Sequence, residues 1–456
     1  MATGMRQVVL KDSMSGELLE VPRDQDVTIY ACGPTVYSRI HIGNARPFVI
    51  FMLLARFLRS EGYPTRLAIN VTDINDKIYE AAASRGVSSE VLASEMTAGY
   101  FEDTDRLGLG RPDAEPLASE TVDQIIALIQ RLIDSDHAYE SGGDVYFSVR
   151  SFDGYGKLSH RSPEDMEQGE DDETGLKRDR LDFALWKARK EGEDTWWESP
   201  WGPGRPGWHI ECSAMAESEL GSLPITIHGG GSDLVFPHHE NEVAQSEAAR
   251  EQTMARIWMH NGMIETDAEK MSKSEGNIFQ LSEALDRFGG EVVVSYLLSG
   301  HYRQPLAFSE ELLEESAARL ERIRNCLRDS PADQPAGEAA VAAVERFRDC
   351  LADDFNTPRA MSELFELVRA ANQGEVDGAA QAITEMLSLV GLESVAAADP
   401  DGKPDEAALE LLARREEARL ERDFEAADRL RDELAEAGWE VRDGPEGASL
   451  VRRSSR

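Results

Sequence analysis

Cysteine is scarce in this chain, which contains only Cys32, Cys212, Cys326 and Cys350 among 456 residues. So few cysteines exclude a fold that depends on a framework of disulfides. Cys326 and Cys350 lie in helical-looking sequence, and we expect them to be small buried residues rather than reactive ones. Cys32 and Cys212 lie in segments that are dense in motifs.

Long apolar segments are also missing. No run of 18 apolar residues occurs, so we expect no membrane span, and residues 1–20 lack the uninterrupted apolar stretch of a secretory signal. These absences predict a cytoplasmic protein. Proline is limited to 19 residues while 41% of the chain is hydrophobic, which argues against a disordered chain and favours about two to four folded domains.

Basic residues are outnumbered: 48 Lys and Arg stand against 86 Asp and Glu, giving a formal net charge of −38. Taken alone, this deficit argues against a nucleic-acid partner, because phosphate binding favours basic surfaces. The acidic residues are spread along the chain, however, as on a surface solvated in a high-salt cytoplasm, where the screening length shrinks to about 3 Å. We therefore interpret the charge as the sign of a halophilic organism, in which local basic clusters can still bind RNA.

The first part of the chain alternates strand, helix and strand patterns. Residues 27–32 predict a strand, residues 47–54 part of a helix, and residues 65–71 a second strand. This order predicts an α/β fold with a Rossmann-like, doubly wound parallel sheet. Ligands of such sheets bind at the carboxyl ends of the strands, where we expect Cys32, His41 and Thr72 to lie.

Two segments far apart in the chain carry residues suited to a polyphosphate. Residues 270–274 place the ammonium groups of Lys270 and Lys273 beside serine hydroxyls, and residues 41–44 place His41 and a glycine at an expected helix start. Alone, the lysine segment could be a solvated turn. Together, the two segments match the paired signatures of the class I aminoacyl-tRNA synthetases, in which a polyphosphate is neutralised during attack at phosphorus.

A metal site is one interpretation of four further residues. His238 and Glu242 are four positions apart in what reads as the opening of a helix, so they share one face. His239 does not share that face and is a poorer candidate ligand. With Cys32 and Cys212, they could form a tetrahedral zinc site. Alternatively, the cysteines are buried apolar residues and the histidine is a helix cap.

The chain resembles the cysteinyl-tRNA synthetases over nearly its whole length. The matching segments are residues 32–37, 70–77, 181–187, 207–215 and 228–242. The resemblance implies ATP-dependent activation of L-cysteine and its transfer to the 3′ end of tRNA(Cys), with Mg²⁺ accompanying the ATP. It implies no DNA or membrane partner, and we expect a monomer rather than a dimer.

The resemblance also implies the site residues. It places one zinc ion per subunit on Cys32, Cys212, His238 and Glu242. It places L-cysteine against Thr72, Trp208 and His209, although Trp208 could instead be an ordinary core residue. The ATP-binding residues that it implies are His41, Gly43, Asn44, Gly230, Gly231, Asp233, Lys270, Ser272 and Lys273, of which His41, Asn44, Lys270 and Lys273 are the expected catalytic groups.

Asn44 departs from the class I pattern, which usually has a second histidine at this position. An asparagine amide can donate a hydrogen bond to a phosphate or ribose oxygen, but it cannot become cationic. Any contribution of charge at this position is therefore lost. We expect function to survive the change.

The chain is divided into five predicted parts. These are residues 1–115 (first half of the catalytic domain), 116–206 (connective insertion), 207–290 (second half with the lysine loop), 291–331 (helical stem-contact region) and 332–456 (helical anticodon-binding domain). In the last part, one helix face ending at Gly438 is predicted from Leu420, Phe424, Ala427, Leu430 and Leu434.

The sequence leaves two alternative functions open. A mycothiol-type ligase joins cysteine to an amino-sugar by the same chemistry, but it lacks a full anticodon-binding region, so residues 332–456 favour the tRNA enzyme. A non-catalytic tRNA-binding relative should have lost the lysine loop or a zinc ligand, and neither loss is seen.

Overall fold

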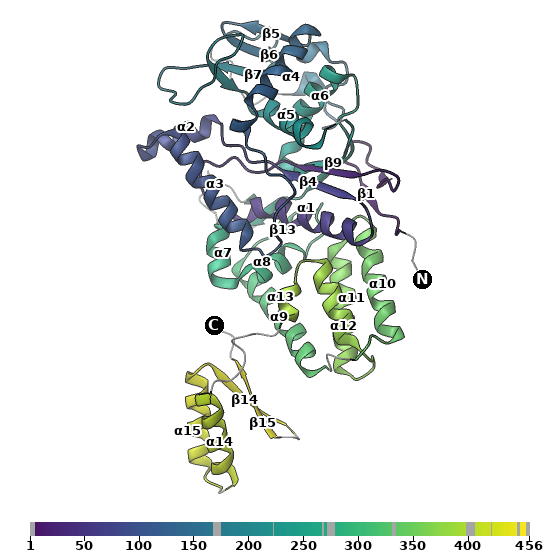
Figure 1. The fold of residues 1–456 in the computed structure, drawn as a ribbon, viewed down its shortest axis with the longest axis vertical. Coiled ribbons are helices and arrows are strands. Elements are labelled where there is room, and N and C mark those ends of the chain that lie inside the picture. The colour runs from purple at the N-terminus through teal and green to yellow at the C-terminus, as the bar shows by residue number, and fades with distance from the viewer. Residues whose placement is uncertain are drawn as a thin grey trace. The chain divides into compact units, whose positions relative to one another are not determined.

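A computed structural model of the protein describes residues 5–166, 175–221, 223–266, 269–270, 279–330, 334–397, 406–420, 422–444 and 447–452. They form two compact units, Met1–Val395 and Ala396–Arg456 (Figure 1). The division falls inside the predicted helical region 332–456. No helix in the described ranges is both long enough and apolar enough to cross a membrane.

A four-stranded parallel sheet forms the centre of the first unit. Its strands, in spatial order, are β10 (Ala255–Asn261), β9 (Ile225–Gly231), β3 (Val27–Ala31) and β4 (Thr65–Ile69). The strands are buried almost throughout, as in parallel sheets that are covered on both faces. The predicted doubly wound parallel sheet is thereby confirmed.

Helices cover both faces of this sheet. α1 (Ile42–Ser60) connects β3 to β4, and α6 (Glu240–Arg250) connects β9 to β10. In Figure 1, α1 lies on one side of the sheet, whereas α5 (Trp208–Leu220) and α6 lie on the other. Residues Phe48 to Leu58, all apolar except Arg56, bury most of α1, so this helix forms where the sequence predicts one.

The chain between β4 and β9 forms a second layer of structure. Its helices are α2 (Asp76–Arg85), α3 (Ser89–Asp105) and α4 (Val122–Asp134). Its antiparallel sheet consists of β5 (Ala138–Ser141), β6 (Asp144–Phe147), β7 (Phe183–Ala188) and β8 (Gly204–Pro206), in that order. Its short 3₁₀ turns are η1 (Ala118–Glu120), η2 (Val149–Ser151) and η3 (Pro163–Asp165), and a fourth, η4 (Ser232–Leu234), follows β9.

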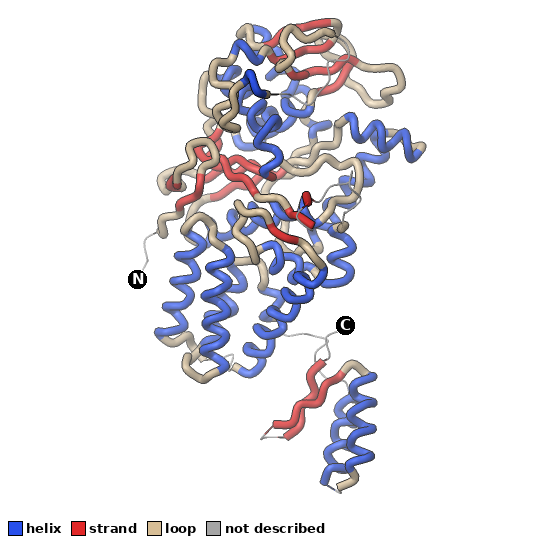
Figure 2. Tube along the Cα trace, turned by 180° about the vertical axis from the view of Figure 1, so that it is seen from behind, coloured by secondary structure: helices blue, strands red, loops and turns tan. Residues whose placement is uncertain are grey.

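Helices and small sheets complete the first unit (Figure 2). The helices are α7 (Leu281–Phe288), α8 (Gly290–Leu297), α9 (Glu310–Asp329), α10 (Glu338–Ala352), α11 (Thr357–Asn372), α12 (Ala379–Leu389) and α13 (Glu393–Ala396). The sheets are β1 (Val9–Lys11) with β2 (Leu18–Glu20), and β12 (Glu269–Lys270), β11 (Ile264–Thr266) and β13 (Leu306–Ala307).

The second unit contains two helices and a hairpin that the sequence did not predict. They are α14 (Glu406–Leu420), α15 (Phe424–Glu436), β14 (Trp439–Gly444) and β15 (Gly447–Arg452). The predicted helix face is confirmed for Ala427, Leu430 and Leu434, which are buried on α15. Its first part is wrong, because Leu420 ends α14 and Asp423 caps a new helix by accepting from the Ala426 N–H at 3.0 Å. Leu420 and Phe424 are consequently 85% and 65% exposed.

Candidate metal centre and nucleotide cleft

The start of α1 is built around His41. The His41 backbone N–H donates to Asn44 Oδ1 at 3.2 Å, so the asparagine side chain caps the first turn. A Cβ on Gly43 would lie 2.8 Å from two ring atoms of His41, so only glycine leaves room for the imidazole there. The chain thus holds an imidazole and a short amide together at the amino-terminal end of a buried helix.

These residues border a cavity of about 450 Å³ at the carboxyl ends of β3 and β9. Predicted site residues that line it are Cys32, His41, Gly43, Asn44, Trp208, Gly231 and Asp233. Thr72, His209 and Gly230 lie behind this surface and are buried. β9 continues through the glycine triplet, residues 229–231. A Cβ on Gly229 would overlap the Met259 carbonyl oxygen of β10.

The predicted lysine segment is mostly outside the described residues. Ser272 and Lys273 belong to residues 271–278, which the structure does not describe. Lys270 ends β12, where its backbone pairs with Glu265 of β11. The backbone of β11 and β12 therefore leads into this segment from the edge of the cavity at Met263.

Four buried donor groups converge from three parts of the chain beside this cavity. Cys32 follows β3, Cys212 lies on α5, and His238 and Glu242 lie where the π-type turn η5 (Val235–His239) enters α6. Their candidate ligand atoms all lie within 4.8 Å of one another. Glu242 Oε1 is 3.3 Å from Cys32 Sγ and 3.2 Å from His238 Nε2.

The donor set fits a zinc ion. Zinc bonds of about 2.0–2.3 Å place tetrahedral ligand atoms roughly 3.3–3.8 Å apart, close to the separations around Glu242. Burial, followed by the neighbouring Cys212 and Glu242, raises the pKa of the Cys32 thiol. The hydrogen bond with Cys32 lowers the pKa of Cys212, but burial and Glu242 outweigh it and raise that pKa overall. Metal entry would therefore release thiol protons.

Burial lowers the pKa of His238 to about 3, which keeps its imidazole neutral and able to bind a metal. Its Nδ1 lies 3.0 Å from Nδ1 of His209, so His209 orients the ring and leaves Nε2 toward Glu242. Trp208 packs on the same ring, with centroids 4.4 Å apart. Trp208 and His209, predicted to contact the amino acid, therefore also support the His238 ring.

A second group of donors shares Cys32 and Glu242 but takes His228 and His239 instead. His228 Nε2 lies 2.9 Å from Glu242 Oε2, and its Nδ1 lies 3.0 Å from the Tyr30 carbonyl oxygen. The first group offers two thiols, which zinc prefers, so we assign His228 to orienting Glu242. Sequence reasoning missed this role, and its only signal is the position of His228 just before the glycine triplet.

Asn70 is another residue that the sequence analysis missed. Fully buried, it donates to Thr72 Oγ1 at 3.3 Å and accepts from the Gly33 N–H at 2.9 Å. Its Oδ1 also lies 3.7 Å from Cys212 Sγ. One amide thereby links the predicted amino-acid contact Thr72 to the turn after β3 and to a candidate metal ligand.

Arg46, on α1, holds part of the cavity wall in place through hydrogen bonds to the backbone. Arg46 is 1% exposed, and its guanidinium donates to the carbonyl oxygens of Gly262 at 2.5 Å, Gln304 at 2.8 Å and His301 at 3.0 Å. Gly262 lines the cavity and lies between β10 and β11, so one side chain connects α1 to the part of the chain that leads toward the lysine segment. Burial lowers the pKa of Arg46 to about 10, which still leaves it charged at neutral pH.

We expect Arg46→Met to lower the free energy of unfolding by about 3 kcal/mol. The change leaves buried carbonyl groups without the hydrogen bonds that the Arg46 guanidinium donates to them. The matched control is Arg66→Met, whose guanidinium is 54% exposed and pairs with Glu219 at 3.4 Å. That change should cost about 0–1 kcal/mol. Urea unfolding followed by circular dichroism measures both, and equal midpoints for the two variants would contradict the role given to Arg46.

Comparisons with known proteins agree with this geometry. Family models match residues 18–318 (tRNA synthetases class I (C) catalytic domain), 346–392 (DALR domain) and 401–449 (cysteinyl-tRNA ligase anticodon binding domain). The cysteine--tRNA ligase of Rubrobacter xylanophilus is 44% identical over 98% of this chain and 100% of its own length. That of Azotobacter vinelandii is 46% identical over 93% of this chain and 94% of its own length.

A solved structure shares the fold. The Mycobacterium tuberculosis methionyl-tRNA synthetase bound by methionyl-adenylate matches with a TM-score of 0.61, covering 82% of this chain and 90% of that chain. The two sequences are 15% identical, so the likeness concerns the fold alone.

Proposed function

Because this chain belongs to the cysteine--tRNA ligase family of class I aminoacyl-tRNA synthetases, we propose that it activates L-cysteine with ATP and transfers it to tRNA(Cys). The observation that carries the proposal is the buried group of Cys32, Cys212, His238 and Glu242 beside a cavity that is also lined by His41 and Asn44. Residues that can hold a thiolate-binding metal ion thus lie beside residues that can bind phosphate.

In the first step, a carboxylate oxygen of L-cysteine attacks the α-phosphorus of ATP, forming cysteinyl-adenylate and releasing pyrophosphate. In the second, a ribose hydroxyl at the 3′ end of the tRNA, the 2′-OH first in class I enzymes, attacks the acyl carbon and releases AMP. Neither step needs a protein nucleophile, so positioning and electrostatic stabilisation supply the acceleration. We assign that stabilisation to His41, Asn44, Lys270 and Lys273.

The other predicted site residues are assigned to the binding of ATP or of L-cysteine. Gly43, Gly230, Gly231, Asp233 and Ser272 join these groups in binding ATP, which arrives with Mg²⁺. Thr72, Trp208 and His209 surround the amino acid.

We assign one zinc ion per subunit to Cys32, Cys212, His238 and Glu242. When bound, it supplies a coordination position that the thiolate of L-cysteine fills well and the hydroxyl of L-serine fills poorly. This chain's own residues hold that position in place: His209 and Trp208 fix the His238 ring, and His228 fixes Glu242.

We further propose a monomeric cytoplasmic protein of a halophilic organism, with tRNA(Cys), ATP and L-cysteine as partners and neither DNA nor a membrane. The surplus of 86 acidic over 48 basic residues supports the halophilic origin. We also propose that the chain has the five parts predicted from the sequence.

Cysteine-dependent exchange of pyrophosphate into ATP, measured at high salt, tests the first step. Charging of tRNA(Cys), compared with ligation to an amino-sugar, tests the second. We expect exchange with L-cysteine and charging of tRNA. Exchange with ligation of an amino-sugar and no charging would favour the mycothiol-type ligase, and binding of tRNA without exchange would favour a non-catalytic relative.

A further inference from the structure

A second cavity, of about 480 Å³, lies next to the catalytic cavity and has no role in the chemistry proposed above. Its walls come from α2, α3, the η1 region and the loop at residues 195–197. α2 and α3 border both cavities: Lys77 and Tyr100 line the catalytic one, whereas Tyr79 and Phe101 line the second. The two cavities therefore adjoin across the first turn of α2 and the body of α3.

The lining of the second cavity suits a flat heteroaromatic group. Three half-buried aromatic side chains contribute to it, namely Tyr79, Phe101 and Trp197. Aromatic faces are what an unstacked nucleobase requires, because such a base binds by stacking on its face.

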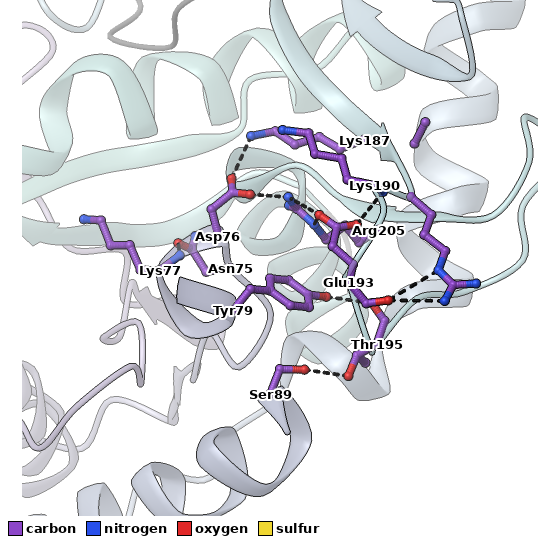
Figure 3. A network of polar contacts seen from close by, with 12 residues as sticks. Asn75, Asp76, Lys77, Tyr79, Ser89, Lys187, Lys190, Glu193, Thr195 and Arg205 are labelled. Carbon is purple, nitrogen blue, oxygen red and sulfur yellow. Dashed lines mark hydrogen bonds and ion pairs between the residues drawn. The ribbon is translucent and has the colours of Figure 1, made fainter. Parts of the chain in front are cut away.

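Polar contacts hold the walls of this cavity in place (Figure 3). Tyr79 donates from its hydroxyl to the Thr195 carbonyl oxygen at 2.7 Å, and Ser89 Oγ lies 2.7 Å from Thr195 Oγ1. Asp76 binds Lys187 at 3.0 Å and also pairs with Arg205. The starts of α2 and α3 are thereby fixed to β7, β8 and the segment between them, so the cavity is preformed.

Lys77 lies between the two cavities and extends away from this network (Figure 3). It is exposed and lies 5.6 Å from the ring centroid of Tyr37. Within the described part of the chain it makes no ion pair, although acidic residues far outnumber basic ones. A cation left available at this point suits a phosphate that joins a nucleotide in one cavity to a nucleotide in the other.

We propose that the second cavity binds one nucleobase of the unpaired 3′-terminal segment of the tRNA while the terminal ribose occupies the catalytic cavity. Lys77 contacts the intervening phosphate, and the aromatic side chains stack on the base. This inference rests on the proposed charging of tRNA. It deepens that proposal by naming a binding site for the acceptor end that is separate from the sites of ATP and L-cysteine.

The test places a larger side chain at the entrance of the second cavity. Ala98 is exposed and lines the cavity, so Ala98→Leu should displace the base, whereas Ala83→Leu, on the exposed face of α2, does not reach it. We expect Ala98→Leu to lower kcat/KM for tRNA about tenfold, in line with the loss of one stacked base. Exchange of pyrophosphate, which needs no tRNA, should stay within about twofold, and Ala83→Leu should change neither value.

Transcripts that lack one base near the 3′ end identify the occupant. With the unaltered protein, one abasic transcript should be charged with about tenfold lower kcat/KM, and with Ala98→Leu that transcript should lose nothing further. Charging of intact tRNA by Ala98→Leu at the unaltered rate, or equal losses from the abasic change in both proteins, would overturn the proposal. Failure of cysteine-dependent exchange in the unaltered protein would instead overturn the proposed function.

Photo-crosslinking covers the case in which Ala98→Leu also lowers exchange and so damages the fold. The unaltered protein is irradiated with tRNA that carries a photoreactive base at each unpaired 3′ position in turn. A crosslink from one position to residues 89–101 or 195–197 is the expected result. Crosslinks confined to other parts of the chain would overturn the proposal.

Discussion

Replacing Cys212 with serine is expected to reduce bound zinc from one ion per chain to a small fraction and to let L-serine compete with L-cysteine. Without a metal–sulfur bond, a pocket separates such near-isosteres only about 10- to 200-fold. Accurate translation needs about 10⁴-fold, equivalent to about 5.5 kcal/mol. Metal analysis and the kcat/KM for exchange with each amino acid measure the two effects.

Cys326→Ser is the matched control for this change. Cys326 is also buried, at 1% exposed, but its sulfur contacts the Val368 carbonyl oxygen at 3.8 Å and lies in none of the candidate metal groups among the described residues. It should keep both the zinc and the selectivity. A Cys212→Ser protein with full zinc occupancy and unaltered preference for L-cysteine would refute the assignment of the metal.

Replacing Lys273 with alanine is expected to slow adenylate formation by about 10²- to 10³-fold, the loss typical of one group that stabilises transition-state charge. Cysteine affinity should change little, because the lysine serves the phosphates and not the sulfur. Exchange at saturating ATP and L-cysteine measures the first quantity, and calorimetric titration of L-cysteine without ATP measures the second.

Lys190→Ala is the control, since Lys190 is exposed and does not line the catalytic cavity. An unchanged exchange rate in Lys273→Ala would remove Lys273 from the catalytic groups. A loss of cysteine affinity as large as the loss of rate would show that the residue supports the whole cleft and not the transition state alone.

The central sheet could be predicted because its sequence signals are local. β3 and β4 are short runs of apolar and β-branched residues, and α1 is a long apolar run between them. The hairpin β14–β15 escaped prediction, since its stability depends on packing against α14 and α15: Trp439 is buried with Ala408 and Leu434. The apolar pattern continues across Asp423, but this residue caps a new helix and so separates α14 from α15.

The candidate metal residues were predictable only in part from spacing. His238 and Glu242 follow from helical periodicity, whereas their meeting with Cys32 and Cys212 depends on the order of the strands and the position of α5. The supporting histidines could not be found by periodicity at all. His228 reaches Glu242 because β9 pairs with β3 in a register that sets His228 opposite Tyr30, and a register of this kind is a property of the folded sheet.

X-ray absorption at the zinc edge, recorded on the purified protein with and without L-cysteine, tests the central claim most directly. The account predicts one zinc ion per chain with two sulfur ligands, rising to three when L-cysteine is added and staying at two with L-serine. A sulfur count that does not change on addition of L-cysteine, at saturating occupancy of the amino acid, would contradict it.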